Sequence, residues 1–170
     1  MLFSVALVGL LANTAASTPL KYKMPANMKI AADCTMPAEY TVDGFSVYTD
    51  SSNQTTVSFA YTDSATGINT RCERNPASKP HNTNPGLASR YACDDANVEF
   101  IYQTTGVAGL TVIEAACPGS GSSTFEASGL VPFNLTCSSA STGQNCTSNP
   151  VDITREFTSL QPRPAGAAAQ

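Results

Sequence analysis

The sequence contains few of the residues that catalytic, metal and nucleic-acid sites require. Its 170 residues include no tryptophan and a single histidine, and only 13% are charged, which is about half the share of a typical soluble domain. A nucleic-acid site needs clustered lysine or arginine side chains to neutralise phosphates, but the net charge is −4 and Lys21, Lys23 and Lys29 are scattered. We therefore expect no nucleic-acid partner.

The chain also lacks an apolar segment long enough to cross a bilayer, for which about 20 residues are needed. The apolar stretch near the N-terminus, Leu2–Ala12, has eleven residues. Thr14, Ala15 and Ala16 follow it and fit the small-residue pattern of a signal-peptide cleavage site. We therefore predict a signal peptide over residues 1–16, a secreted, extracellular protein and no membrane partner. The alternative, an N-terminal strand or helix buried in the fold, agrees less well with the polar, cysteine-bearing remainder.

Removal of the signal peptide leaves about 150 residues, the usual size of one domain. Residues 17–33 show little periodicity and contain two prolines, so we interpret them as an extended lead-in or a short pro-segment. Residues 34–160 are predicted to form a single β domain. Residues 161–170 are predicted to be a disordered tail.

From Cys34 onwards, apolar and polar residues alternate, which is typical of half-buried β-strands. The clearest predicted strands are Thr55–Thr62, Asn97–Gln103 and Gly129–Cys137. The last of them contains Pro132, which lacks an N–H group and therefore suits an edge strand. No segment repeats apolar residues at helical spacing over three turns.

Three further segments refine this pattern. Leu110–Ala116 is almost continuously apolar and is predicted to be a central strand. In Tyr40–Tyr48 the apolar face changes phase at Gly44, as a β-bulge allows. Asn75–Ala88 holds three prolines and is predicted to be a long loop. The predicted fold class is all-β: a compact antiparallel β-barrel or sandwich of roughly seven to ten short strands, linked by disulfides.

The six cysteines predict three disulfides and no free thiol, because an even number in an exported chain is typical of a disulfide framework. A metal site is not expected, since the chain has no Cys-x-x-Cys motif. Six cysteines allow 15 connectivities. We expect the first of the following pairings and leave the other two open: Cys72–Cys93 across the proline-rich loop, Cys117–Cys137 at two strand ends and, by elimination, Cys34–Cys146.

Three Asn-x-Ser/Thr sequons, at Asn53, Asn134 and Asn145, are candidate glycosylation sites in a secreted chain. Asn53 lies in a predicted turn between two strands. The alternation places Asn134 on the outward side of its predicted strand. Asn145 precedes Cys146, whose oxidation competes with the addition of a glycan.

No catalytic, cofactor-binding or metal-ligating residue is predicted. His81 lies in a loop rich in proline and asparagine, without an acid and a nucleophile around it, and is interpreted as a surface residue. Glu114 and Glu126 are candidates for the carboxylate pair of a glycosidase, although isolated carboxylates on strands are generally solvated. Asp94 and Asp95 are too few for a calcium loop and suit a turn.

The aromatic residues mostly occupy the strand phases that face the predicted core, and we expect them to form that core. A carbohydrate-binding platform needs several of them exposed together. They are Tyr40, Phe45, Tyr48, Phe59, Tyr61, Phe100, Tyr102, Phe125 and Phe133.

The order of these segments is similar to that of a known family. An early cysteine leads into a tyrosine-containing strand (CTMPAEYTVDGF), a central pair follows (TRC, then SRYAC), and an alternating strand comes next (NVEFIY). An apolar strand then ends in a cysteine (LTVIEAAC), and a glycine-led strand closes the pattern (FEASGLVPFNLTC). Over Cys34–Cys137 the chain resembles the secreted fungal proteins of the Alternaria major-allergen-like family.

The resemblance implies a compact β-barrel, a fungal source, secretion and a role as allergen, elicitor or effector in contact with plant hosts, without an established enzymatic activity. Cys72 and Cys93 match the central disulfide of the family. Cys117 matches the first cysteine of its later pair, but the partner position falls near Ala127, where this chain has no cysteine. The early cysteine links two subunits in the type member. The even count lets Cys34 pair internally here, so a covalent dimer is not implied.

We expect the protein to act without enzymatic activity or a cofactor, by binding a host protein or a small ligand at the host interface, as a monomer or a non-covalent dimer. A carbohydrate-binding or structural cell-wall protein is the alternative, which the serine- and threonine-rich sequence suggests. A small hydrolase that uses Glu114 or Glu126 ranks third. The usual two-carboxylate mechanism requires both carboxyl groups on one face of the sheet and within roughly 10 Å.

Overall fold

A computed structural model describes residues 19–26, 28, 30, 34–82, 86–117 and 125–163. Over these residues the protein has eleven strands and no helix. The predicted signal peptide lies outside the described residues. The strands are β1 (Glu39–Asp50), β2 (Thr55–Asp63), β3 (Ile68–Arg74), β4 (Tyr91–Ala92), β5 (Val98–Gln103), β6 (Gly109–Ala116), β7 (Phe125–Val131), β8 (Leu135–Ala140), β9 (Gly143–Ser148), β10 (Asp152–Glu156) and β11 (Ser159–Pro162).

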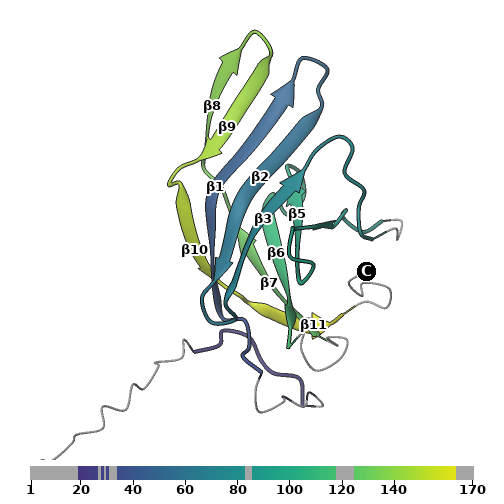
Figure 1. Ribbon diagram of the computed structural model, residues 1–170, viewed down its shortest axis with the longest axis vertical. Helices are drawn as coiled ribbons and strands as arrows, with labels where there is room; N and C mark the ends of the chain where they lie inside the picture. Colours follow the sequence, from purple (N-terminus) through teal and green to yellow (C-terminus); the bar gives the residue numbers. More distant parts are fainter. Residues whose placement is uncertain are drawn as a thin grey trace, which may run out of the picture.

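The strands form two antiparallel sheets with the core between them (Figure 1). Sheet A has the order β3-β2-β1-β9-β8, and β10 also pairs with β1. Sheet B has the order β11-β7-β6-β5-β4. No pairing between described strands joins the two sheets, so they do not close into a barrel. The all-β prediction is confirmed, and of its two alternatives the sandwich is the one that forms.

A bulge at Gly44 divides the long strand β1 into two parts, which pair with different strands along one edge. Gly44 has a φ of 62°, a left-handed conformation that glycine adopts readily. The register with β2 shifts between Asp43 and Ser46, and Val42 and Phe45 are both fully buried on either side of the shift. The predicted bulge is therefore confirmed. Before the bulge β1 pairs with β10, and after it β1 pairs with β9.

Most of the predicted core aromatics are in the core. Tyr40, Phe45, Phe59, Tyr61 and Phe100 are buried, and the partly buried Tyr102, Phe125 and Phe133 pack against them. Tyr48 is the exception, because its side of β1 faces solvent and leaves it 36% exposed. Rings from the two sheets meet directly: Phe59 of sheet A packs edge-on against Phe100 of sheet B with 5.1 Å between centroids.

The predicted strand Gly129–Cys137 is wrong, because it is two strands that belong to different sheets. β7 ends at Val131 in sheet B, and β8 begins at Leu135 in sheet A. The segment between them contains Pro132, which cannot donate a ladder hydrogen bond. The apolar alternation continues through this crossing because the residues on either side of Pro132 both face the interior.

The first and last described segments also pack on the sandwich. Tyr22 of the lead-in is only 7% exposed, and its hydroxyl donates a hydrogen bond to the carbonyl of Pro37. Gln161 and Pro162 belong to β11, so the predicted tail begins too early. The short strands β4 and β11 bring the count above the predicted range. Figure 1 shows the lead-in at the opposite end from the tips of the β1–β2 and β8–β9 hairpins.

Candidate functional site

Three disulfides involve all six cysteines. Cys72 of β3 pairs with Cys93, which follows β4, and this prediction is confirmed. Cys137 pairs with Cys146, and the two residues lie directly opposite each other on β8 and β9. The predicted partners of both cysteines are therefore wrong. The sequence pattern did not show that the segments around Cys137 and Cys146 form a hairpin.

The third disulfide joins Cys34, which precedes β1, to Cys117, which follows β6. The two sulfur atoms lie 3.9 and 3.6 Å from Sδ of Met36, which is packed in the core. The predicted pairs Cys117–Cys137 and Cys34–Cys146 are therefore wrong. The strand pattern does not place Cys34, because this residue precedes the first strand, β1.

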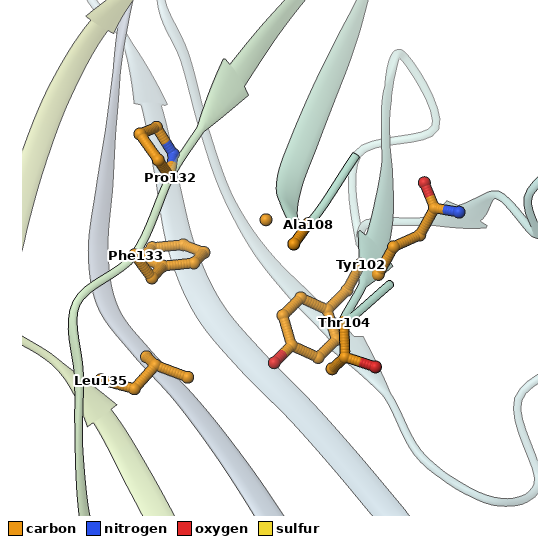
Figure 2. A pocket seen from close by; sticks show the side chains of 8 residues that line it. Tyr102, Thr104, Ala108, Pro132, Phe133 and Leu135 are labelled. Carbon is orange, nitrogen blue, oxygen red and sulfur yellow. The ribbon is translucent and has the colours of Figure 1, made fainter. Parts of the chain in front are cut away.

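A groove lies where β5 ends, β6 begins and the chain crosses from β7 to β8. Its volume is about 280 Å³. Figure 2 shows that its two walls face each other across the space, one from the β7–β8 crossing and one from the β5–β6 hairpin. Pro132, Phe133 and Leu135 lie on the first wall and Tyr102, Thr104 and Ala108 on the second, and Gln103 and Gly109 complete the lining.

The aromatic walls of the groove are anchored on the core. Phe133 stacks on the fully buried Phe45, with 3.9 Å between ring centroids, and the ring of Tyr102 lies 5.4 Å from the same side chain. Burial raises the pKa of the Tyr102 hydroxyl, and the charge of Arg74 opposes this effect. The hydroxyl is therefore neutral and can donate a hydrogen bond. A preformed apolar groove with a few polar groups is typical of small-molecule sites.

No family model matches the chain, and no curated protein matches it in sequence. The resemblance to the Alternaria major-allergen-like family therefore stays an expectation drawn from the residues themselves.

The groove was not predicted from the sequence, because its walls come from segments that lie apart in the chain. Alternation alone assigns Tyr102 and Phe133 to the core. Their position near residues that turn the chain could have set them apart from the other core aromatics. Tyr102 lies shortly before Gly106, and Phe133 follows Pro132 directly.

Glu114 and Glu126, the candidate hydrolase pair, lie on neighbouring strands but on opposite faces of sheet B. In the β6–β7 register Glu114 is opposite Ala127 and Glu126 is opposite Ala115. Directly paired residues share a face and successive residues alternate, so Glu114 faces the core and Glu126 faces outward. Two carboxyl groups so placed cannot flank one bond. Both are buried, at 0% and 6% exposure, so the expectation that they are solvated is wrong.

Glu126 belongs to a group of charges on the outer face of sheet B, here named the charged cluster: His81, Arg90, Glu99, Glu126 and Arg163. Arg90 Nη1 and Nη2 each lie 2.9 Å from a carboxylate oxygen of Glu126. Glu99 Oε1 lies 2.6 Å from His81 Nδ1 and 3.7 Å from Arg163 Nη2. His81 is therefore not a free surface residue, and the cluster holds its loop against sheet B.

The guanidinium of Arg90 is stabilised by both glutamates. Burial lowers the pKa of Arg90, but the hydrogen bond and the charge of Glu126, together with Glu99, outweigh burial and raise the pKa above its usual value. Glu99 Oε2 lies 3.6 Å from Arg90 Nη1. The cluster is therefore a buried ion-pair network, and its geometry fits a role in structure.

The three sequons are all exposed. Asn53 lies in the β1–β2 connection with a φ of 61°. Asn134 lies between β7 and β8, so it is exposed but not on a strand as predicted. Asn145 lies on β9 opposite Ser138. Their glycosylation stays a prediction.

The remaining sequence candidates do not form a site. Asp95 Oδ1 accepts a hydrogen bond from the N–H of Asn97 at 2.9 Å, so Asp94 and Asp95 belong to a turn as predicted. In the described part of the chain, no three His, Cys, Asp or Glu side chains are placed to hold a metal ion. Among the described residues there is also no helix with the length and apolar character to span a bilayer. Tyr48 alone of the described aromatic side chains is exposed.

Proposed function

We propose that this protein is a secreted, non-enzymatic binding protein that takes a small, mostly apolar ligand into the groove between Tyr102 and Phe133. The groove carries the proposal, because the aromatic rings of its walls, Tyr102 and Phe133, are packed against Phe45 in the core, and the Tyr102 hydroxyl adds one hydrogen-bond donor. Its volume of about 280 Å³ lies near the roughly 300 Å³ lower limit of small-molecule sites. A small molecule is therefore the occupant that fits, rather than a segment of a protein.

The place of action is proposed on separate grounds. Three disulfides in a domain of this size are compatible with an extracellular location. The residue pattern from Cys34 to Cys137 supports a fungal protein that acts at the plant host interface, as an allergen, elicitor or effector. Glu114 and Glu126 lie on opposite faces and do not favour the hydrolase, and Tyr48 alone does not favour a carbohydrate platform.

We expect the protein to bind 1-anilinonaphthalene-8-sulfonate, used as an apolar probe, at one saturable site. Ala108→Phe is expected to weaken this binding at least about tenfold, or about 1.4 kcal/mol. Ala108 is an exposed residue on the wall of the groove, so a phenyl group there fills the groove without removing a core contact. A fluorescence titration measures the affinity.

The matched control is Ala60→Phe, the same change at an exposed position on the outer face of β2. It is expected to leave the affinity within about twofold of the original value. Equal losses in the two variants, or no saturable binding by the unaltered protein, contradict the assignment of the groove as the binding site.

A further inference from the structure

Two carboxyl groups are buried between the sheets without a basic partner. Glu114 on β6 and Asp63 at the end of β2 are both fully buried. The Thr66 hydroxyl is near Glu114, and the Ala38 N–H is near Asp63. Glu114 Oε1 and Asp63 Oδ2 nevertheless accept no hydrogen bond of ordinary length from the described residues. Native proteins rarely leave buried polar atoms unpaired, so each such atom needs a physical explanation.

The groups that act on the pKa of Glu114 are all acidic or neutral. From β2, the Tyr61 hydroxyl donates a hydrogen bond to Glu114 Oε2, and Asp63 lies two residues further along the same face. Tyr22 faces it from the lead-in and Asp95 from the turn before β5. None of the charged groups that shift the pKa of Glu114 is basic.

The surroundings favour the protonated form of Glu114. Burial raises its pKa to about 7, against the hydrogen bond from Tyr61 and with the added effect of the Asp63 charge. Burial also raises the pKa of Asp63, although the N–H groups of Ala65 and Thr66 donate to its Oδ1 at 2.7 and 3.2 Å. The folded protein therefore retains a proton on Glu114 at pH values where the unfolded chain has released it.

We propose that Glu114 is a proton-binding site built into the interface between the sheets, and that loss of its proton releases the lead-in, residues 19–26, from the end of the sandwich. The lead-in places Tyr22 in the core, and the charges of Glu114 and Asp63 both raise the pKa of the Tyr22 hydroxyl. It is tied by the Tyr22 hydroxyl to the Pro37 carbonyl and by the exposed Lys21–Glu156 pair at 3.6 Å, without strand pairing. This inference does not depend on the groove.

The direction of the effect follows from the raised pKa. The proton on Glu114 stabilises the fold fully below about pH 4.5, the ordinary value for glutamate, and this contribution is lost as the pH rises to about 7. Above that range Glu114 and Asp63 are both ionised in a poorly solvated site, and water that enters under the displaced lead-in relieves their repulsion.

Urea unfolding of the protein and of Glu114→Gln between pH 4.5 and 7.5 tests the stability part of the proposal. Glutamine keeps the shape of the side chain and an oxygen for the Tyr61 hydroxyl, but it cannot ionise. We expect the ratio of the two unfolding constants to change by roughly 100-fold over this range. Glu73→Gln, at a carboxyl group with 41% exposure, is the matched control and is expected to change by less than about twofold. A constant ratio for Glu114→Gln overturns the proposal.

Limited trypsin digestion separates release of the lead-in from a general loss of stability. Lys23 is exposed and lies next to the buried Tyr22, so cleavage after Lys23 reports whether the lead-in is held in place. After normalisation to a peptide substrate, we expect this cleavage to be faster at pH 7.5 than at pH 5.5 in the unaltered protein and to stay slow in Glu114→Gln. Equal normalised rates at the two pH values in the unaltered protein overturn the release, and this measurement stands even if the variant does not fold.

Discussion

Replacement of Cys34 and Cys117 together by alanine is expected to lower the free energy of unfolding by about 4 kcal/mol. This disulfide joins residues with a sequence separation of 83. In the chain-entropy model a cross-link restricts the unfolded chain more strongly when the closed loop is longer. The disulfide also holds the segment just before β1 beside the end of β6, where Met36 Sδ lies 3.6 Å from Cys117 Sγ. Its loss therefore acts on the unfolded ensemble and on local packing.

The matched control is the double replacement of Cys137 and Cys146, whose sequence separation is 9. The shorter loop predicts a loss of about 2.5 kcal/mol. Urea unfolding followed by circular dichroism gives both values. A larger loss for the Cys137–Cys146 pair than for the Cys34–Cys117 pair would mean that loop length does not govern the stabilisation.

These two disulfides also explain which pairing could be predicted from the sequence. Cys72 and Cys93 lie on either side of one predicted proline-rich loop, so a local pattern is enough to pair them. Cys34 follows a segment without periodicity, and its position depends on how side chains such as Tyr22 fit over the end of the sandwich. No local pattern encodes that path, so the partner of Cys34 could not be derived from spacing.

Alternation predicted strands well because it reports which side chains face the core. It predicted β2 and the bulge at Gly44, and an almost continuous apolar run predicted the central strand β6. It did not reveal the change of sheet at Pro132, since both sheets present apolar residues to the same interior. The alternation also places Glu114 on the core face with Val112. The hydroxyl that hydrogen-bonds to Glu114 belongs to Tyr61 in the other sheet, so the partner of this carboxyl group could not be predicted from the pattern of its own strand.

The charged cluster could not be predicted for the same reason, because its members are brought together only by the fold. Arg90 and Glu126 are separated by 36 positions in the chain. Arg90 lies at the end of a proline-rich loop, and Glu126 lies on a strand with neighbouring apolar residues. Only the register of sheet B, together with the return of the loop over its outer face, brings the two side chains together.

Replacement of Arg90 by methionine is expected to lower the free energy of unfolding by about 3 kcal/mol. The guanidinium makes two contacts of 2.9 Å with Glu126, and the two side chains are 20% and 7% exposed. Removal of one partner from a buried ion pair leaves an uncompensated charge, which typically costs about 3–5 kcal/mol. The lower limit applies because Arg90 retains some contact with water. Methionine keeps an apolar stem of similar length, so the loss reports mainly on charge.

The matched control is Arg71→Met, which removes the partner of Glu73 at a site where the side chains are 67% and 41% exposed. Water screens that pair, so a loss of less than about 1 kcal/mol is expected. Glu126→Gln in the Arg90→Met background removes the buried charge and is expected to recover part of the stability. Equal losses for the two arginine variants, or no recovery, would show that the pair does not stabilise the fold. Urea unfolding measures these losses of stability. Because the Arg90 loop is held to sheet B through this pair, we also expect faster amide exchange in residues 76–82 of Arg90→Met.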